Sequence, residues 1–146
     1  MYDDCSINMS GFSIDDIYVG QTARFSKTVT ESDIYTFAGV TGDFNPIHVN
    51  KEYAAKTRFG ERIAHGMLTA SFFSTVLGMM LPGAGAIYLS QNSKFLLPVK
   101  IGDTITAQGV VTEINKEKRI FTVETTAFNQ RNEVVIKGEA KMMATK

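Results

Sequence analysis

The chain has 146 residues, and its fifteen basic and fifteen acidic side chains balance to a formal charge of zero. This length predicts one domain, residues 1–146, and the lack of a Lys/Arg cluster argues against nucleic-acid binding. No apolar run reaches the roughly eighteen residues of a membrane span, and the N-terminus lacks a signal-peptide pattern. The single cysteine rules out an intrachain disulfide and suits a reducing compartment. We therefore expect a cytoplasmic protein that does not associate with a membrane.

The first part of the chain predicts one strand and two short helices. Residues 1–18 are polar and read as a loosely docked N-terminal extension. The elements expected after it are a strand over residues 21–29, a helix over 32–40 and a helix over 51–56. Thr30 with Asp33 is close to a capping box before the first helix, and Asn50 is placed to cap the second.

The run from residue 64 to residue 81 predicts one long helix, with no charged residue between Gly66 and Leu81. A helix that is apolar on every side is expected to be buried on every side, so Ser74 and Leu77 are predicted to face inward. The stop signal is Pro82-Gly83.

Alternating apolar residues predict strands in the rest of the chain. They are expected over residues 86–90 and 94–97 as one broken strand, then over 104–114, 119–129 and 133–143. One long helix followed by antiparallel strands indicates an α+β fold in which a curled sheet wraps around the central helix.

The stretch Thr41-Gly-Asp-Phe-Asn-Pro-Ile-His48 places a carboxylate and an imidazole five residues apart. Pro46 has no backbone N–H and disfavours the helical conformation at the residue before it, while Gly42 can end the preceding helix. We expect a stiff, non-helical arm with Asp43 and His48 at its ends. These two side chains are candidates for acid/base chemistry, but Gly-Asp and Asn-Pro are also ordinary turn formers.

That motif, together with Ile63-Ala-His-Gly-Met-Leu68, resembles the (R)-specific enoyl-CoA hydratases, which belong to the MaoC-like branch of the hot-dog fold. The similarity extends from about residue 20 to the C-terminus and leaves the N-terminal extension outside. The resemblance implies a homodimer whose two sheets join edge to edge. It also implies reversible syn addition of water to a trans-2-enoyl-CoA, giving the (R)-3-hydroxyacyl-CoA, with neither a metal nor a cofactor.

The resemblance also implies roles for individual residues. Asp43 and His48 would hold and activate one water, and the main-chain N–H of Gly66 would bind the thioester oxygen. A backbone N–H at a helix start suits the negative charge that grows on that oxygen. His65 is expected to be a buried, satisfied histidine without a catalytic role.

Asn45 and Ser74 each have two interpretations, and Leu77 has a less defined role. Asn45 either orients the arm or the water, or is only a residue of a pre-proline turn. Ser74 would touch the catalytic pocket, but a buried helical serine bonded to its own backbone is an equal alternative. Leu77 is expected to help set the pocket depth.

Other acyl-thioester proteins remain as alternatives. Hot-dog thioesterases, and dehydratases acting on carrier-bound substrates, commonly use an acidic residue on the central helix, and residues 67–81 contain none. A non-catalytic acyl-CoA-binding module stays open. The sequence leaves open the acyl chain length and the pathway, whether polyester supply or fatty-acid oxidation. Candidate contacts to the CoA phosphates are Arg58, Arg62 and Lys94.

Overall fold

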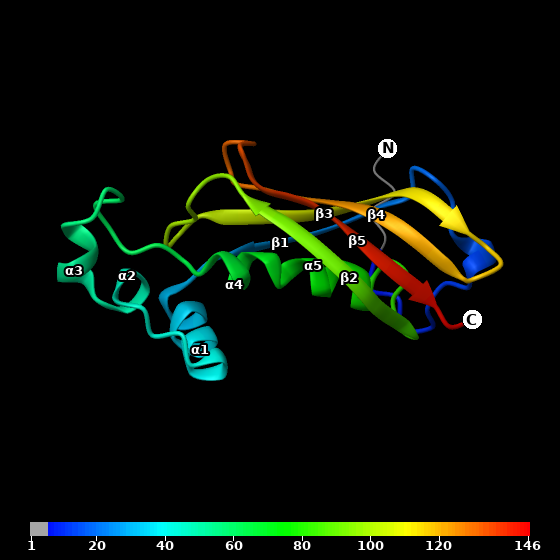
Figure 1. Ribbon diagram of the computed structural model, residues 1–146, viewed down its shortest axis with the longest axis horizontal. Coiled ribbons are helices and arrows are strands. Elements are labelled where there is room, and N and C mark those ends of the chain that lie inside the picture. Colours follow the sequence, from blue (N-terminus) through cyan, green and yellow to red (C-terminus); the bar gives the residue numbers. More distant parts are fainter. Residues whose placement is uncertain (1–5) are drawn as a thin grey trace.

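A five-stranded antiparallel sheet forms the body of the protein in the computed structural model, which describes residues 6–146 (Figure 1). The strands are β1 (Thr22–Thr28), β2 (Ala86–Phe95), β3 (Thr104–Asn115), β4 (Ile120–Phe128) and β5 (Val134–Ala144). Their spatial order is β1-β3-β4-β5-β2, so β1 and β2 are the edges of the sheet. The apolar side chains of β3, β4 and β5 alternate toward the helices and form most of the strand contribution to the core.

The helices divide into a group under the sheet and a group beyond its end. They are η1 (Ile14–Asp16), α1 (Glu31–Thr41), α2 (Pro46–Val49), α3 (Lys51–Ala55), α4 (Gly66–Ala70) and α5 (Phe72–Met79). Figure 1 shows α4 and α5 lying along one face of the sheet, while α1, α2 and α3 overhang one end of it. The α+β architecture agrees with the sequence prediction.

The central helix differs from the prediction in two ways. It is interrupted at Ser71, which separates α4 from α5. It is also buried on one face only, since Phe73 and Leu77 are fully buried whereas Ser74 is exposed. The prediction that the helix is buried on every side, with Ser74 facing inward, is therefore wrong for the single chain. The physical reason is that one sheet covers one side of a helix, and no other layer among residues 6–146 covers the exposed side of α5.

The N-terminal segment is more firmly attached than its polar composition predicts. The backbone N–H of Asn8 donates to the carbonyl of Met79 at 2.7 Å, and the carbonyl of Asn8 accepts from Ala84 at 3.1 Å. Ile14 and Ile17 are buried in the core. Residues 8–12 thus pack against the end of α5 and the loop that follows it, and Ile14 bonds to the backbone of Lys146. Residues 1–5 of the expected loose extension lie outside the described part of the chain.

The helix caps expected from the sequence are confirmed, because each depends on a side chain that contacts backbone groups a few residues away. The Thr30 and Asp33 side chains form a full capping box, and Asn50 caps α3 by accepting from the N–H of Tyr53. The broken strand is instead continuous, because β2 pairs with β5 along its length and absorbs one irregularity between Tyr88 and Ser90. No helix in residues 6–146 has the length and apolarity needed to cross a membrane.

Phe73→Ala tests the position of the core. Phe73 is fully buried in the main hydrophobic cluster, so the truncation is expected to lower the free energy of unfolding by about 3–5 kcal/mol. Urea denaturation of the variant and the parent measures the change. Val40→Ala, at a position that is 80% exposed on α1, is the control and is expected to shift stability by less than about 0.5 kcal/mol. An equally small change for Phe73→Ala would show that α5 is not the core helix.

Candidate active site

A chain of short-range hydrogen bonds shapes the loop between α1 and α3. The helix α1 ends at Gly42, which has a φ of 82°, a conformation that glycine adopts without strain. The Asp43 carboxylate accepts from the N–H of Asn45 at 3.1 Å, and the Asn45 side chain accepts from the N–H of Ile47 at 3.1 Å. Each bond turns the backbone, so Asp43 and His48 are brought back toward each other.

The prediction of a wholly non-helical arm is wrong for its second half. Pro46 is the first residue of the one-turn helix α2, with Asn45 as its N-cap. Proline suits this position because the first N–H of a helix has no intrahelical partner and the ring fixes a helical φ. Pro46 therefore starts a new helix, and this helix carries His48 on its inner side.

His48 is buried, with 8% of its surface exposed. Its Nδ1 lies 2.7 Å from the carbonyl oxygen of Ile63, and because a carbonyl only accepts, Nδ1 carries the hydrogen. The neutral ring then has a bare lone pair on Nε2. Burial lowers the pKa of His48 below its ordinary value of 6.5, and this effect together with the nearby His65 outweighs the opposing effects of the Ile63 hydrogen bond and the Asp43 carboxylate. His48 is thus held in the form that accepts a proton.

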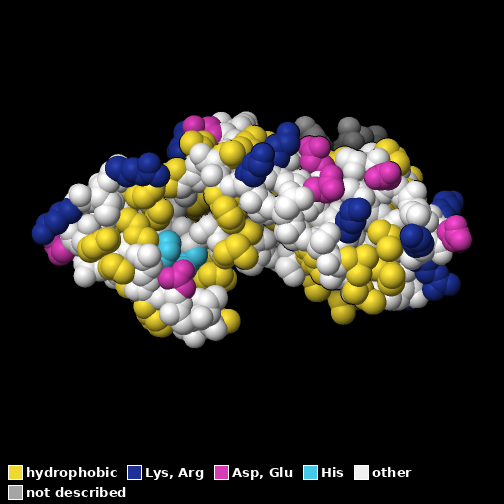
Figure 2. Space-filling view, in the orientation of Figure 1, with side chains coloured by type: hydrophobic (Ala, Val, Ile, Leu, Met, Phe, Trp, Pro, Cys, Tyr) yellow, Lys and Arg dark blue, Asp and Glu magenta, His cyan; other side chains and the backbone are white. Residues whose placement is uncertain are grey.

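The side chains of Asp43 and His48 come together with that of His65, which lies in a later segment of the chain. One potential donor or acceptor atom of each side chain lies within 4.8 Å of the others, a distance that one water can span with two hydrogen bonds. The His48 and His65 rings are stacked, with centroids 3.8 Å apart and planes inclined by 27°. Figure 2 shows the histidines in a hollow, with an acidic side chain in front and apolar side chains around them.

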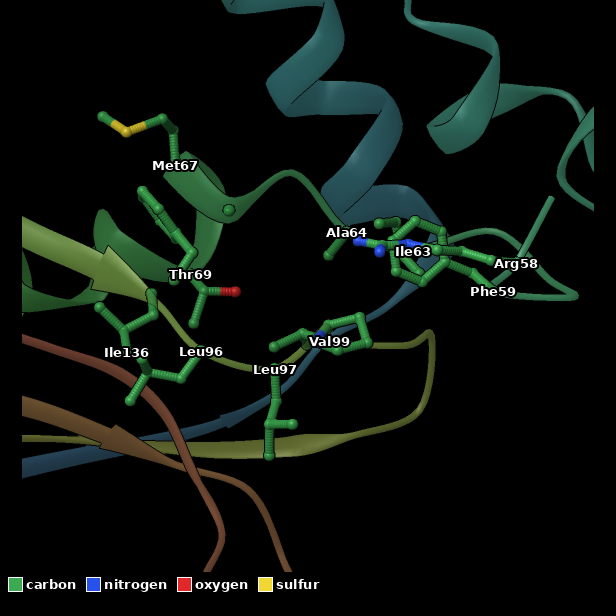
Figure 3. A pocket seen from close by; sticks show the side chains of 13 residues that line it. Arg58, Phe59, Ile63, Ala64, Met67, Thr69, Leu96, Leu97, Val99 and Ile136 are labelled. Carbon is green, nitrogen blue, oxygen red and sulfur yellow. The ribbon is translucent and has the colours of Figure 1, made fainter.

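Gly66 begins α4 directly after His65, at a position where backbone N–H groups lack intrahelical partners. A methyl group on Gly66 would approach the Phe95 ring to 2.7 Å, so the absence of a side chain lets the Phe95 ring pack against this helix start. Gly66 also lines a cavity of about 400 Å³, shown in Figure 3. Its other lining residues are Arg58, Phe59, Ile63, Ala64, Met67, Thr69, Phe95, Leu96, Leu97, Pro98, Val99 and Ile136.

The predicted site residues separate into two groups. Asp43, His48 and Asn45 lie in one loop, and the cavity adjoins that loop through Ile63, whose carbonyl holds His48. Asp43 and His48 do not themselves line the cavity. Ser74 is exposed, and the fully buried Leu77 belongs to the core cluster, so within this chain neither of them lines it.

The sequence analysis did not identify Thr69. Its side-chain oxygen is buried and has no hydrogen-bond partner among the described residues, and Figure 3 shows it directed into the cavity. An unpaired buried hydroxyl is unfavourable unless a ligand or water bonds to it. In the sequence, the feature that could have identified Thr69 is its hydroxyl, which stands alone in the otherwise apolar turn Gly66–Ala70.

The three side chains that the sequence offered as contacts to the CoA phosphates, Arg58, Arg62 and Lys94, have different surroundings. Arg62 is engaged, with its guanidinium 2.6 Å from Glu31 and 2.8 Å from the Tyr35 hydroxyl. Lys94 does not line the cavity, whereas Arg58 does and lies over the ring of Phe59. Arg58 is therefore the cation placed to meet an anionic ligand at this cavity.

Known proteins resemble this chain over most of its length. Residues 17–133 match the family described as MaoC like domain. An (R)-specific enoyl-CoA hydratase from Rhodospirillum rubrum is 54% identical over 129 residues, which is 88% of this chain and 89% of the relative. Two solved structures match closely. The (R)-hydratase from A. caviae involved in PHA biosynthesis has a TM-score of 0.85, 44% identity, and coverage of 88% of this chain and 97% of that one. The R-hydratase PhaJ1 from Pseudomonas aeruginosa has a TM-score of 0.88, 41% identity, and coverage of 92% and 86%.

These similarities define the fold as the hot-dog fold of the R-hydratases, which confirms the fold class expected from the sequence. The chain belongs to the MaoC-like domain family.

The depressed pKa of His48 predicts a pH-dependent stability. As the pH falls through about 6.5, an unfolded histidine takes up a proton while the buried His48 resists, so the unfolded state binds more protons and the free energy of unfolding falls. His48→Gln removes this contribution. Urea denaturation at about pH 7.5 and about pH 5.5, above the range where carboxyl groups titrate, is expected to show a smaller loss of stability for the variant than for the parent. Equal losses would contradict the assignment.

Proposed function

We propose that this protein is an (R)-specific enoyl-CoA hydratase, a hydro-lyase that adds water reversibly to trans-2-enoyl-CoA and gives the (R)-3-hydroxyacyl-CoA. The observation that carries the proposal is the placement of Asp43 and His48 within 4.8 Å, next to the helix start at Gly66. Similarity to R-hydratases along nearly the whole chain supports the same activity. Fatty-acid metabolism in the cytoplasm is the proposed setting, and the match to an (R)-hydratase involved in PHA biosynthesis supports delivery of the product to polyester synthesis.

In the proposed reaction, one water lies between the Asp43 carboxylate and the bare Nε2 of His48. These groups withdraw a proton as the water oxygen attacks C3 of the enoyl group. Negative charge then develops on the thioester oxygen, and the N–H of Gly66 stabilises it. The withdrawn proton is returned to C2 on the same face, so H and OH of one water end on C2 and C3 and no other reactant is consumed.

The cavity beside the helix start is proposed to hold the acyl-pantetheine part of the substrate. Its volume of about 400 Å³ is within the usual range for small-molecule sites, and its lining is mainly apolar. Arg58 at this cavity is proposed to contact a CoA phosphate. Ser74 is retained as a proposed pocket residue only for the assembled dimer, where a partner chain can cover the exposed side of α5. Leu77 is fully buried in the core cluster and is not retained.

A thioesterase remains the less supported interpretation. Helices α4 and α5 contain no acidic residue, so the central helix provides neither the base nor the nucleophile that this branch commonly uses. An assay with crotonyl-CoA distinguishes the two activities, because hydration removes the enoyl absorbance whereas hydrolysis releases free thiol.

Asp43→Asn and His48→Gln test the mechanism with that assay. If both side chains act on one water, each variant is expected to lose at least about a hundredfold in kcat. The double variant is expected to lose little more than the worse single variant, because residues that act as a unit are not additive. Asp15→Asn, an exposed aspartate on η1, is the matched control and should keep the parental rate. A well-folded Asp43→Asn protein with parental activity would show that Asp43 is only a turn residue.

The protein is further proposed to form a homodimer through the edge strand β2. Every residue of this strand is at least partly exposed, and large apolar side chains lie along it and the segment after it. They are Ile87, Tyr88, Leu89, Phe95, Leu96 and Leu97. An unpaired sheet edge with apolar side chains is a ready site for pairing with a second chain.

Light scattering at micromolar concentration is expected to give twice the chain mass of 16.1 kDa. Leu89→Glu places a charge on the exposed edge and is expected to shift the population toward monomer, whereas Val19→Glu, at an exposed turn position, should not. A parent protein with the mass of one chain would contradict the dimer.

A further inference from the structure

His65 contacts both members of the proposed catalytic pair. It is 2% exposed, and its Nε2 lies 2.9 Å from the backbone carbonyl oxygen of Asp43. Its ring stacks on the ring of His48, and the edge of Phe37 packs against it with the centroids 4.9 Å apart. The residue thus lies between α1 and the loop that carries Asp43 and His48.

Hydrogen-bond chemistry fixes the form of the His65 ring. A carbonyl only accepts, so Nε2 carries the hydrogen, and in the neutral ring Nδ1 keeps a bare lone pair. Nδ1 is buried and has no partner among the described residues. A second hydrogen on Nδ1 would be a buried N–H without an acceptor among the described residues. The neutral ring donates to Asp43 and is unsuited to exchanging protons with a water.

The bond to His65 differs from the other bonds of the Asp43 segment. The Asp43 N–H donates to Thr41 at 3.1 Å, and the Asp43 carboxylate accepts from Asn45, so these contacts stay within the loop. Among the hydrogen bonds described for residues 42–45, the one from His65 is the bond that reaches a distant part of the chain. It ties the base of the Asp43 side chain to the segment that starts α4.

We infer that His65 is a positioning residue for hydration: its Nε2–H holds the Asp43 backbone, and its ring supports His48, so that both groups face one water. This inference rests on the proposed function for its kinetic consequence. It does not rest on that function for the arrangement itself, which is given by the hydrogen bond to Asp43 and the ring contact with His48. His65 therefore acts through Asp43 and His48 and does not touch the reacting atoms.

Two variants separate the contributions of His65. His65→Phe keeps a flat ring against His48 but removes the donor, and His65→Gln keeps an N–H donor near the position of Nε2. With crotonyl-CoA, the Phe variant is expected to lose at least about tenfold in kcat, the effect of one lost hydrogen bond with an unpaired carbonyl, with KM changed by less than about twofold. The Gln variant is expected to recover part of this loss. Lys118→Ala, on the turn between β3 and β4, is the control with parental kinetics. A folded Phe variant with parental kcat would overturn the inference, and so would a Gln variant no faster than the Phe variant.

A measurement on the unaltered protein keeps the inference testable if a variant fails to fold or if the parent proves to have no hydratase activity. The chain has two histidines, so a long-range ¹H–¹⁵N spectrum shows two imidazole patterns. Comparison with His48→Gln assigns them. The expected result is an Nε2–H on the ring of His65 and an Nδ1–H ring for His48 near neutral pH. A His65 ring that carries its hydrogen on Nδ1 and none on Nε2 would overturn the inference, whereas loss of hydratase activity with the expected tautomers would contradict only the proposed function.

Discussion

Two hydrogen bonds from imidazole rings to backbone carbonyls hold the candidate site together. His48 donates to Ile63, and His65 donates to Asp43, so the loop after α1 and the segment before α4 each provide one donor and one acceptor to the other. Buried imidazoles and carbonyls are costly when unpaired. The loop therefore has few alternative positions, and the Asp43 carboxylate stays close to the ring of His48.

The same two bonds determine the state of the histidines. Each bond places a hydrogen on one ring nitrogen, and burial lowers the pKa of His48. His48 is left with a lone pair toward the site, while the lone pair of His65 is buried. Two residues of the same type thus differ in what they can do, because they differ in which nitrogen is tied to a carbonyl.

The one-layer architecture explains the exposed apolar surface. A single sheet covers one side of α4 and α5, so Met67 and Met79 are 62% and 41% exposed, and β2 is an edge of the sheet formed by the described strands. The cavity and the helix start at Gly66 lie close to this uncovered surface. A second copy of the chain covering it would bury apolar area and at the same time enclose the site.

The sequence by itself determined the features that depend on neighbouring residues. Thr30, Asp33 and Asn50 form the predicted caps, Gly42 ends α1, and the motif with Asp43 and His48 identifies the family, because these signals act within a few residues. Contacts between distant segments were decided only by the tertiary structure. The exposure of Ser74 depends on how many layers cover α5, and the continuity of β2 depends on pairing with β5. The role of His65 depends on a carbonyl 22 residues away, and no local pattern encodes which carbonyl a buried ring will meet.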